Sequence, residues 1–285
     1  MIACVSQSMP TPARRKIKRY GWIPDLPDRR DRMFAAPAAQ LRALPPSVDL
    51  TATCPPVYDQ GALGSCTANA IAGALQFDQT CSPATPRPPN DAHGNGHGHG
   101  RRCPDTFTPS RLFIYYNERV IEGTVDEDSG ATLRDGIKSV AKQGAPHEPL
   151  WPYVIARFRT KPPTKAYSDG RRHRALLYER IPRLLEQMQG CLAAGFPFVF
   201  GFSVYESFES RDVARTGVMP MPKPGEVQLG GHAVLAVGYD TGARRFLVRN
   251  SWGPGWGRQG YFTMPFDYAL DDALSDDFWT VKAVA

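Results

Sequence analysis

The chain has 285 residues, which is enough for one two-lobed unit or two small domains with a substantial core. Hydrophobic residues make up 42% and aromatic residues 11%, and no apolar run approaches the roughly 20 residues of a membrane span. The net charge of +6 is too mild to indicate a nucleic-acid partner, so no nucleic acid and no membrane span are expected.

The first 44 residues are interpreted as a leader. Residues 1–12 are polar and lack the apolar core and cleavage site of a secretory signal, so the localisation stays open. The basic run at 14–19 is read as solvated, with an anionic partner as the alternative. Tyr20 and Trp22 then lie in a stretch interrupted by prolines, which is typical of an extended segment packed on something else.

Hydrophobic periodicity predicts helices early in the chain and strands late. The predicted helices are 68–77, 110–121, 131–142 and 181–194, and the predicted strands are 198–204, 233–239, 245–249, 260–264 and 278–284. Helices that precede a set of strands favour an α+β fold.

Two insertions interrupt this pattern. Residues 82–102 are rich in Pro and then in Gly and His, between Cys81 and Cys103. A flexible loop, which a disulfide between these cysteines could close, is one interpretation. Weak metal binding by the histidines of the run is the other, although no Cys pair lies near them and no metal site is expected. These histidines are His93, His97 and His99. Residues 169–174 are interpreted as an exposed loop, with a phosphate-type ligand as the alternative.

Cys66 stands where a Gly-rich turn gives way to a helical run. The N-H groups and the dipole of a helix N-terminus favour a thiolate, so the pattern predicts a lowered pKa and a nucleophilic sulfur. A buried structural cysteine is the alternative interpretation, because free Cys often serves as a small core residue.

A thiol nucleophile needs a base, and the base needs an orienting partner. His232 opens an apolar run that is typical of a buried strand, and Asn250 follows the next strand. An Asn carbonyl can fix the imidazole, and the neighbouring Trp252 can shield that bond from water. Gln60, together with the backbone N-H of Cys66, can donate to an oxyanion.

These three blocks, in this order, resemble the papain-like cysteine peptidases, and the resemblance covers about residues 45–285. It implies a two-lobed fold with a helical left lobe (45–156), a β-barrel-like right lobe (157–285) and the active-site cleft between them. It further implies Cys66 as nucleophile, His232 as general base and then acid, Asn250 as orienter and Gln60 as oxyanion donor. Gly130, Ala131, Gly231 and Trp252 are expected to bind substrate, and no cofactor is expected.

The chain departs from the family's cysteine signature at two positions. Leu63 replaces the first Cys, and residues 126–130, where the resemblance places its partner, also lack Cys, so both halves of a disulfide are missing. Thr67 replaces an aromatic residue, which is expected to alter the floor of the primed side. The nucleophile and base are 166 residues apart (232 minus 66), a spacing that the insertions account for.

The resemblance implies a cysteine endopeptidase that acts on polypeptides through an acyl-enzyme. A papain-fold aminopeptidase of the bleomycin hydrolase type or a thiol acyltransferase would share the same residues. A non-catalytic binding protein and a His-rich metal buffer are further alternatives. The leader has no counterpart of a long helical pro-domain, so a part of 14–40, anchored by Tyr20 and Trp22, is expected to lie in the substrate groove of a monomeric enzyme.

Substrate preference is not predicted. The C-terminal segment contributes acidic residues that are interpreted as exposed, with a carboxylate in a specificity pocket as the alternative. These residues are Asp271, Asp272, Asp276 and Asp277.

Overall fold

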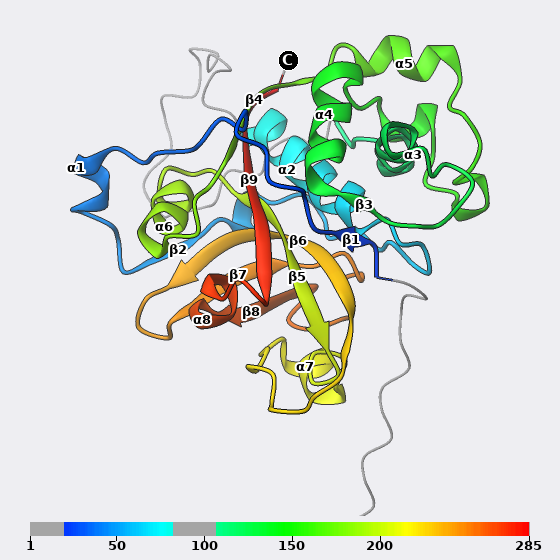
Figure 1. Ribbon diagram of the computed structural model, residues 1–285. Coiled ribbons are helices and arrows are strands. Elements are labelled where there is room, and N and C mark those ends of the chain that lie inside the picture. Colours follow the sequence, from blue (N-terminus) through cyan, green and yellow to red (C-terminus); the bar gives the residue numbers. More distant parts are fainter. Residues whose placement is uncertain (1–19, 82–106, 285) are drawn as a thin grey trace, which may run out of the picture.

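A computed structural model describes residues 20–81 and 107–284. The basic run at 14–19, the histidines of the Gly/His run and the proposed Cys81–Cys103 pairing lie outside the described residues. Most of the longer helices lie on one side of the molecule and the main sheet on the other, as Figure 1 shows.

The helical side consists of α2 (Cys66–Cys81), α3 (Arg111–Glu122), α4 (Leu133–Gln143) and α5 (Thr164–Gly170). Ser110 caps α3, because its hydroxyl accepts a 3.2 Å hydrogen bond from the Phe113 N-H, and Thr132 caps α4 in the same way. The predicted helix 131–142 therefore starts two residues late. Ala131–Thr132 instead form the short strand β3.

The sheet has seven antiparallel strands in the order β4-β9-β5-β6-β7-β8, with β2 paired to β6. In chain order they are β2 (Ser47–Asp49), β4 (Ala175–Arg180), β5 (Phe198–Tyr205), β6 (Gln228–Asp240), β7 (Arg245–Arg249), β8 (Tyr261–Pro265) and β9 (Ser275–Val284). Within the described residues the path ends at β4 and β8 without pairing those two strands, so the sheet does not close into a barrel.

Short elements complete the fold. They are β1 (Trp22–Ile23), α1 (Ala38–Leu41), η1 (Thr51–Thr53), η2 (Glu148–Leu150), η3 (Ile155–Arg157), α6 (Leu185–Ala193), α7 (Arg211–Thr216) and α8 (Phe266–Leu270). The helix predicted at 181–194 begins four residues late, because Pro182 breaks the pattern. The sequence patterns did not predict α5, β4 or α7.

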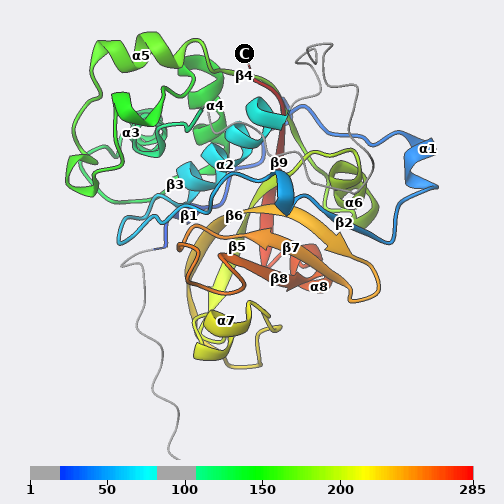
Figure 2. The same cartoon turned by 180° about the vertical axis from the view of Figure 1, so that it is seen from behind.

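Helix α2 lies in the centre of the molecule, between the other helices and the sheet (Figure 2). Ile71 and Leu75 of α2 belong to one buried cluster with Phe113 of α3 and Leu235 of β6. Every residue from 66 to 78 is buried, which suits a helix that is covered on all sides. The fold therefore holds the first residue of α2, Cys66, rigidly against the sheet.

The leader runs along the surface of this frame and contributes to its core. Strand β1 pairs in parallel with β3, and further on the N-H of Phe34 donates to the carbonyl of Arg180 at 2.8 Å. Phe34 and Ala36 are buried in the second hydrophobic cluster with Met188 of α6. The chain then enters the main sheet through β2 (Figure 1).

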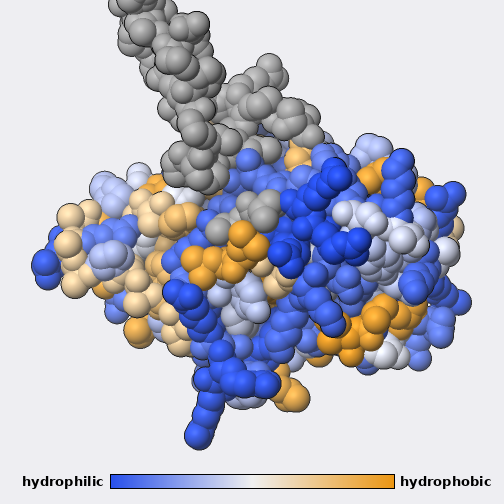
Figure 3. Space-filling view, turned by 90° about the horizontal axis from the view of Figure 1, so that it is seen from above, coloured by the Kyte–Doolittle hydropathy of each residue, from blue (hydrophilic) through white to orange (hydrophobic). Residues whose placement is uncertain are grey.

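On the face shown in Figure 3, hydrophobic residues form separate patches between hydrophilic ones. Among the described residues, no helix combines the length and the apolar character that crossing a bilayer requires.

Candidate active site

His232 and Asn250 meet at the centre of the sheet. His232 lies on β6 and Asn250 directly follows β7, the neighbouring strand. The Nε2 of His232 lies 2.8 Å from Oδ1 of Asn250, and this oxygen also accepts the N-H of Ser251 at 2.8 Å. Since an amide oxygen can only accept, Nε2 carries the proton. The other ring nitrogen, Nδ1, is buried and has no hydrogen-bond partner among the described residues, so it keeps a lone pair.

Cys66 is the first residue of α2, as the turn before it predicts. Its side chain is fully buried, and burial raises the pKa of the thiol to about 12, although backbone N-H groups of Ala233 and Gly21 oppose the shift. The expectation of a lowered pKa is therefore wrong for this state of the protein. Desolvation outweighs the helix N-terminus because water does not reach the sulfur. Because Ala233 follows His232 in the chain, its contact with the sulfur places the imidazole of His232 close to the thiol of Cys66.

Burial affects His232 in the same sense. It lowers the pKa of the imidazole to about 4, against a smaller opposing effect of the hydrogen bond to Asn250. With the pKa of the thiol raised and that of the imidazole lowered, both groups are neutral near pH 7. The covered site therefore holds a thiol and an imidazole, not an ion pair.

Gln60 is fixed by four hydrogen bonds, one of which its carbonyl accepts from the hydroxyl of Tyr153 at 3.0 Å. Its Oε1 accepts the hydroxyl of Ser251 at 2.6 Å, its Nε2 donates to the carbonyl of Leu63 at 2.9 Å, and its backbone N-H donates to the carbonyl of Ser251. An amide nitrogen carries two hydrogens, so one remains for a further acceptor. Because Ser251 is next to Asn250, one residue couples the positions of Gln60 and the His232 partner.

Aromatic rings cover the His232 and Asn250 pair. The ring of Trp252 lies 5.0 Å from that of His232, and Trp252 packs in turn on Trp256 and Phe208. Tyr20 of the leader adds a ring 6.1 Å from His232.

The leader lies directly over these residues. The N-H of Gly21 is directed at the sulfur of Cys66, and its carbonyl accepts the N-H of Ala131 at 2.7 Å. A Cβ on Gly21 would stand 1.7 Å from the carbonyl oxygen of Gly64, and one on Gly130 would stand 2.2 Å from the Gly21 oxygen. Only glycine permits this approach. The sulfur of Cys66 therefore faces the N-H of Gly21, whereas the carbonyl of Gly21 is bonded to the N-H of Ala131.

The indole of Trp22 packs against two glycines of the sheet, Gly201 of β5 and Gly231 of β6. A Cβ on Gly201 would lie 1.9 Å from this ring, and Gly231 is also in contact with Trp22. The Nε1 of Trp22 donates to Oδ2 of Asp277 at 3.1 Å. Asp277 is fully buried, so the interpretation of all four C-terminal carboxylates as exposed is wrong for this one. All four predicted substrate-binding positions therefore lie at the leader, since Tyr20 also contacts Trp252.

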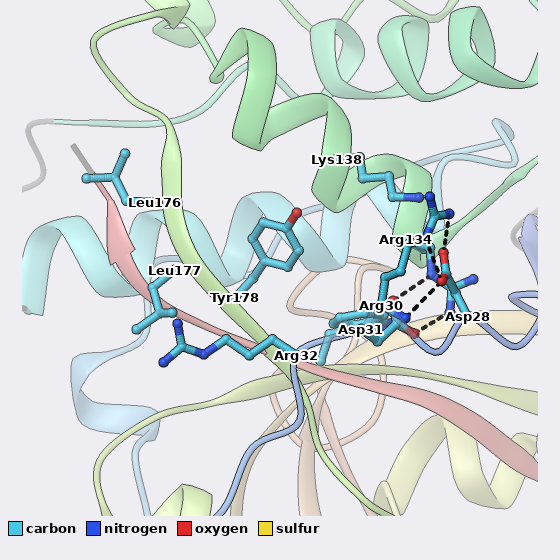
Figure 4. A pocket seen from close by; sticks show the side chains of 10 residues that line it. Asp28, Arg30, Asp31, Arg32, Arg134, Lys138, Leu176, Leu177 and Tyr178 are labelled. Atoms are coloured by element: carbon cyan, nitrogen blue, oxygen red, sulfur yellow. Dashed lines mark hydrogen bonds and ion pairs between the residues drawn. The ribbon is translucent and has the colours of Figure 1, made fainter.

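A second set of contacts holds the leader against α4 and β4. Asp31 pairs with Arg134 at 2.6 Å and with Arg180 at 3.4 Å, and Arg32 pairs with Glu179 at 3.0 Å. Asp31 and Arg134 lie close together among the residues that line a cavity of about 440 Å³ (Figure 4). Such partly buried pairs fix the register of the leader.

Sequence reasoning missed several residues that support the site. Ser251 orients Gln60, and the amide N-H of Gly64 is held by Asp128 at 3.0 Å. Thr67 donates to Glu118 of α3 at 2.7 Å, so it points into the helical core and not toward the floor of the primed side. The position of Ser251 beside Asn250 was the only local signal. The other partners are far apart in sequence.

Comparison with known proteins gives a consistent result. A family model described as "Papain family cysteine protease" matches residues 126–271. A peptidase C1-like protein of Acanthamoeba polyphaga mimivirus is 39% identical over 94% of this chain and 88% of its own length. The crystal structure of xylellain, a cysteine protease from Xylella fastidiosa, is 41% identical with a TM-score of 0.81, covering 98% of this chain and 100% of that one.

A more distant structure, procathepsin B S9 from Trypanosoma congolense, shares the fold with a TM-score of 0.69 at 18% identity, over 93% of this chain and 86% of that one. The fold is accordingly the α+β, papain-like one that the sequence predicts, and the enzyme class is a cysteine-type peptidase, a hydrolase. The match to the family model, the two relatives near 40% identity and the site geometry lead to one assignment: the chain belongs to the papain family of cysteine proteases.

Proposed function

We propose that this protein is a cysteine endopeptidase that works through Cys66, His232 and Asn250 and is held inactive by its own leader. The observation that carries the proposal is the hydrogen bond from His232 Nε2 to Asn250 Oδ1, which leaves Nδ1 as the proton acceptor. The N-H of Ala233 at the sulfur supports the placement of Cys66 next to this nitrogen. The lobe boundaries near 44/45 and 156/157 remain part of the proposal.

The chemistry follows from these positions. When a peptide and water replace the leader, Nδ1 takes the proton of Cys66, and the thiolate attacks the substrate carbonyl carbon. The free hydrogen of the Gln60 amide and the N-H of Cys66 donate to the oxyanion. His232 then protonates the leaving amine to give an acyl-enzyme. A water molecule that gives its proton to Nδ1 hydrolyses the acyl-enzyme and releases the thiol.

The leader contacts support inhibition without cleavage. Gly21 offers its N-H to the sulfur, whereas attack would need a carbonyl carbon there with its oxygen at Gln60. The Gly21 carbonyl instead accepts the Ala131 N-H. The leader therefore fills the groove in an orientation that the nucleophile cannot use.

The test is hydrolysis of an internal peptide blocked at both ends, after the leader has been removed. Cys66→Ala should abolish cleavage and His232→Ala should be nearly as damaging, whereas Asn250→Ala should be milder because the ring still samples its working orientation. Cys191→Ala, another buried cysteine, serves as the matched control and should retain activity. Hydrolysis by Cys66→Ala would contradict the proposal. Cleavage of unblocked peptides alone would favour an aminopeptidase, and transfer of the acyl group to an added amine would favour an acyltransferase.

A further inference from the structure

Three potential metal ligands meet where the turn after α4 contacts the end of α5. They are His147, Asp169 and His173, and one ligand atom from each lies within 4.8 Å of the others. None of the three belongs to the proposed catalytic set.

The backbone clamps the two stretches together. A Cβ on Gly144, which has φ +70°, would stand 1.6 Å from the carbonyl oxygen of Gly170, so the two main chains touch. The N-H of Ala145 donates to the carbonyl of His173 at 3.1 Å, and the N-H of His147 donates to Oδ2 of Asp169 at 2.9 Å. The three side chains are therefore brought together by main-chain contacts that do not depend on a ligand.

The two imidazoles each have a partner at Nδ1. In His147 it lies 2.9 Å from Oδ2 of Asp169, and in His173 it lies 2.8 Å from the side-chain amide of Gln79. The nitrogen of the Gln79 amide faces His173, and rotation of the amide places its oxygen there, where it can accept an Nδ1-H. Such an outer partner at Nδ1 orients His173 so that its Nε2 is directed at a metal ion. In His147 the ion instead takes the place of the hydrogen bond to Asp169 and binds Nδ1 directly. The Nδ1 of His147 and Oδ2 of Asp169 already lie at about the spacing of two ligand atoms on one ion, so Asp169 supplies the third ligand atom.

Both imidazoles lie against one aromatic ring. Phe107 covers the pair, stacked 4.3 Å from His173 and edge-on 4.9 Å from His147.

We propose that His147, Asp169 and His173 form a binding site for a divalent transition cation of the zinc class. Two imidazoles and one carboxylate, with water as a fourth ligand, are a donor set that zinc accepts. Ligand atoms around a tetrahedral zinc ion stand about 3.3 Å apart, given bonds of about 2.1 Å. The side chain of His147 is 40% exposed and has room for the rotation that closes the present spacing. The bound ion ties the turn after α4 to α5.

The experiment uses the full chain with Cys66→Ala, so that the thiol neither binds metal nor cleaves the protein. Zn²⁺ alone is titrated by calorimetry, and thermal unfolding is followed with and without Zn²⁺. A matched variant, His93→Ala/His97→Ala/His99→Ala, removes the other candidate histidines and should still bind one Zn²⁺ and unfold at a higher temperature with the ion. In that background Asp169→Asn and His173→Gln should each weaken binding at least about tenfold and remove the thermal shift.

Each outcome decides the question. In Asp169→Asn the side-chain oxygen can still accept the backbone N-H of His147. An unfolding temperature without zinc that equals that of the parent shows that this variant is folded. If both single variants bind Zn²⁺ as tightly as their parent, the assignment is overturned. It is equally overturned if the triple histidine variant, folded by circular dichroism, binds no zinc, since the metal then belongs to residues 93–99.

Discussion

The reactivity of Cys66 depends on what covers it. In the covered state the pKa of the thiol is about 12 and that of His232 about 4, both shifted by burial. A helix N-terminus alone does not make a thiolate here, because the desolvation of the charged sulfur outweighs the favourable effect of the helix dipole. Removal of the leader restores water and the possibility of a thiolate and imidazolium pair.

Alkylation tests this argument. Full-length protein should react with iodoacetamide at Cys66 slowly at pH 7, and removal of residues 1–26 should raise the rate at least tenfold, because the sulfur becomes both exposed and ionisable. The labelled site is read by peptide mass spectrometry, with half-buried Cys54 as an internal reference. Equal rates for Cys66 in the two proteins would mean that the leader does not shield the thiol.

Gln60 offers a second prediction at the same scale. Gln60→Ala should lower kcat of the leader-free enzyme on the order of 10²-fold or more, the usual effect of losing one oxyanion donor. Ser251→Ala removes the 2.6 Å bond that orients Gln60 and should lower kcat by a smaller factor, with little change in KM. Steady-state kinetics checks both. A rise in KM alone for Gln60→Ala would assign the residue to substrate binding.

At the scale of elements, the segment that follows β1 meets β9 through two buried carboxyl groups, those of Asp25 and Asp277. Oδ2 of Asp277 accepts the N-H of Asp25 at 2.8 Å, and the indole of Trp279 donates to Asp25. Burial, and then the charge of Asp25, raise the pKa of Asp277 to about 7, while Arg180 at 3.1 Å opposes the shift. The leader thus places the carboxyl group of Asp25 next to that of Asp277. A proton on Asp277 stabilises this contact, because it removes the repulsion between two buried charges.

Binding of the leader should therefore depend on pH through the carboxyl groups of Asp25 and Asp277, whose pKa values burial raises, and in the opposite sense through His232. Asp277 has a raised pKa in the covered state. Its contribution to the affinity for the leader is therefore complete below the ordinary value of 3.8 and is lost as the pH rises through about 7. His232 has a lowered pKa, so its contribution is complete above 6.5 and is lost as the pH falls through about 4. Between pH 4 and 6.5 the two slopes have opposite signs, and the affinity of the native pair should change little.

Single substitutions separate the two slopes. The measurement is fluorescence anisotropy of a labelled peptide of residues 14–26 bound to the Cys66→Ala protein without its first 26 residues. Asp277→Asn should make binding weaken as the pH falls, and His232→Gln should make it weaken as the pH rises. Each slope should approach tenfold per pH unit for one proton. Identical pH profiles in the two variants would refute the assignment of the slopes to these groups.

At the scale of the whole molecule, local patterns were enough to find the catalytic candidates. Cys66, His232 and Asn250 each occupy the end of an element that periodicity predicts, and Gln60 lies in the turn before α2. Contacts between distant segments were beyond such patterns. Asp277 meets Trp22 across 255 positions, and its burial could not be inferred from a run of four nearby acidic residues.

The parts of the fold that were missed have a common cause. Elements α5 and β4 lie in a stretch rich in Lys, Arg and Pro, whose polar composition hides the few inward residues, such as Ala166 and Ala175. The leader was predicted to be extended and to be anchored by Tyr20 and Trp22. Its continuation to Phe34 was not predicted, because the surfaces it meets belong to β4 and to the late-starting α6.

The described residues of the leader differ in what they contact. Residues 20–26 cover Cys66 and His232, whereas residues 31–44 belong to the frame, since Asp31 pairs with Arg134 and Phe34 is buried. Both parts bury an aromatic side chain, Trp22 in the first and Phe34 in the second. Burial of an aromatic side chain contributes roughly 1.5 to 3 kcal/mol, which is a large share of the stability of a typical domain.

Two truncations should therefore behave differently. Removal of residues 1–26 should raise kcat/KM on a small blocked peptide and, because it takes away buried Trp22, lower the unfolding temperature. Removal of residues 1–40 also takes away Phe34 and the Asp31 pairs, so it should lower the unfolding temperature by several degrees more. Phe34→Ala in the full chain is the matched control, since it should lower the unfolding temperature while the site stays covered and inactive. If removal of residues 1–26 leaves kcat/KM unchanged, residues 20–26 have no inhibitory role, and if removal of residues 1–40 costs no further stability, residues 31–40 do not belong to the frame.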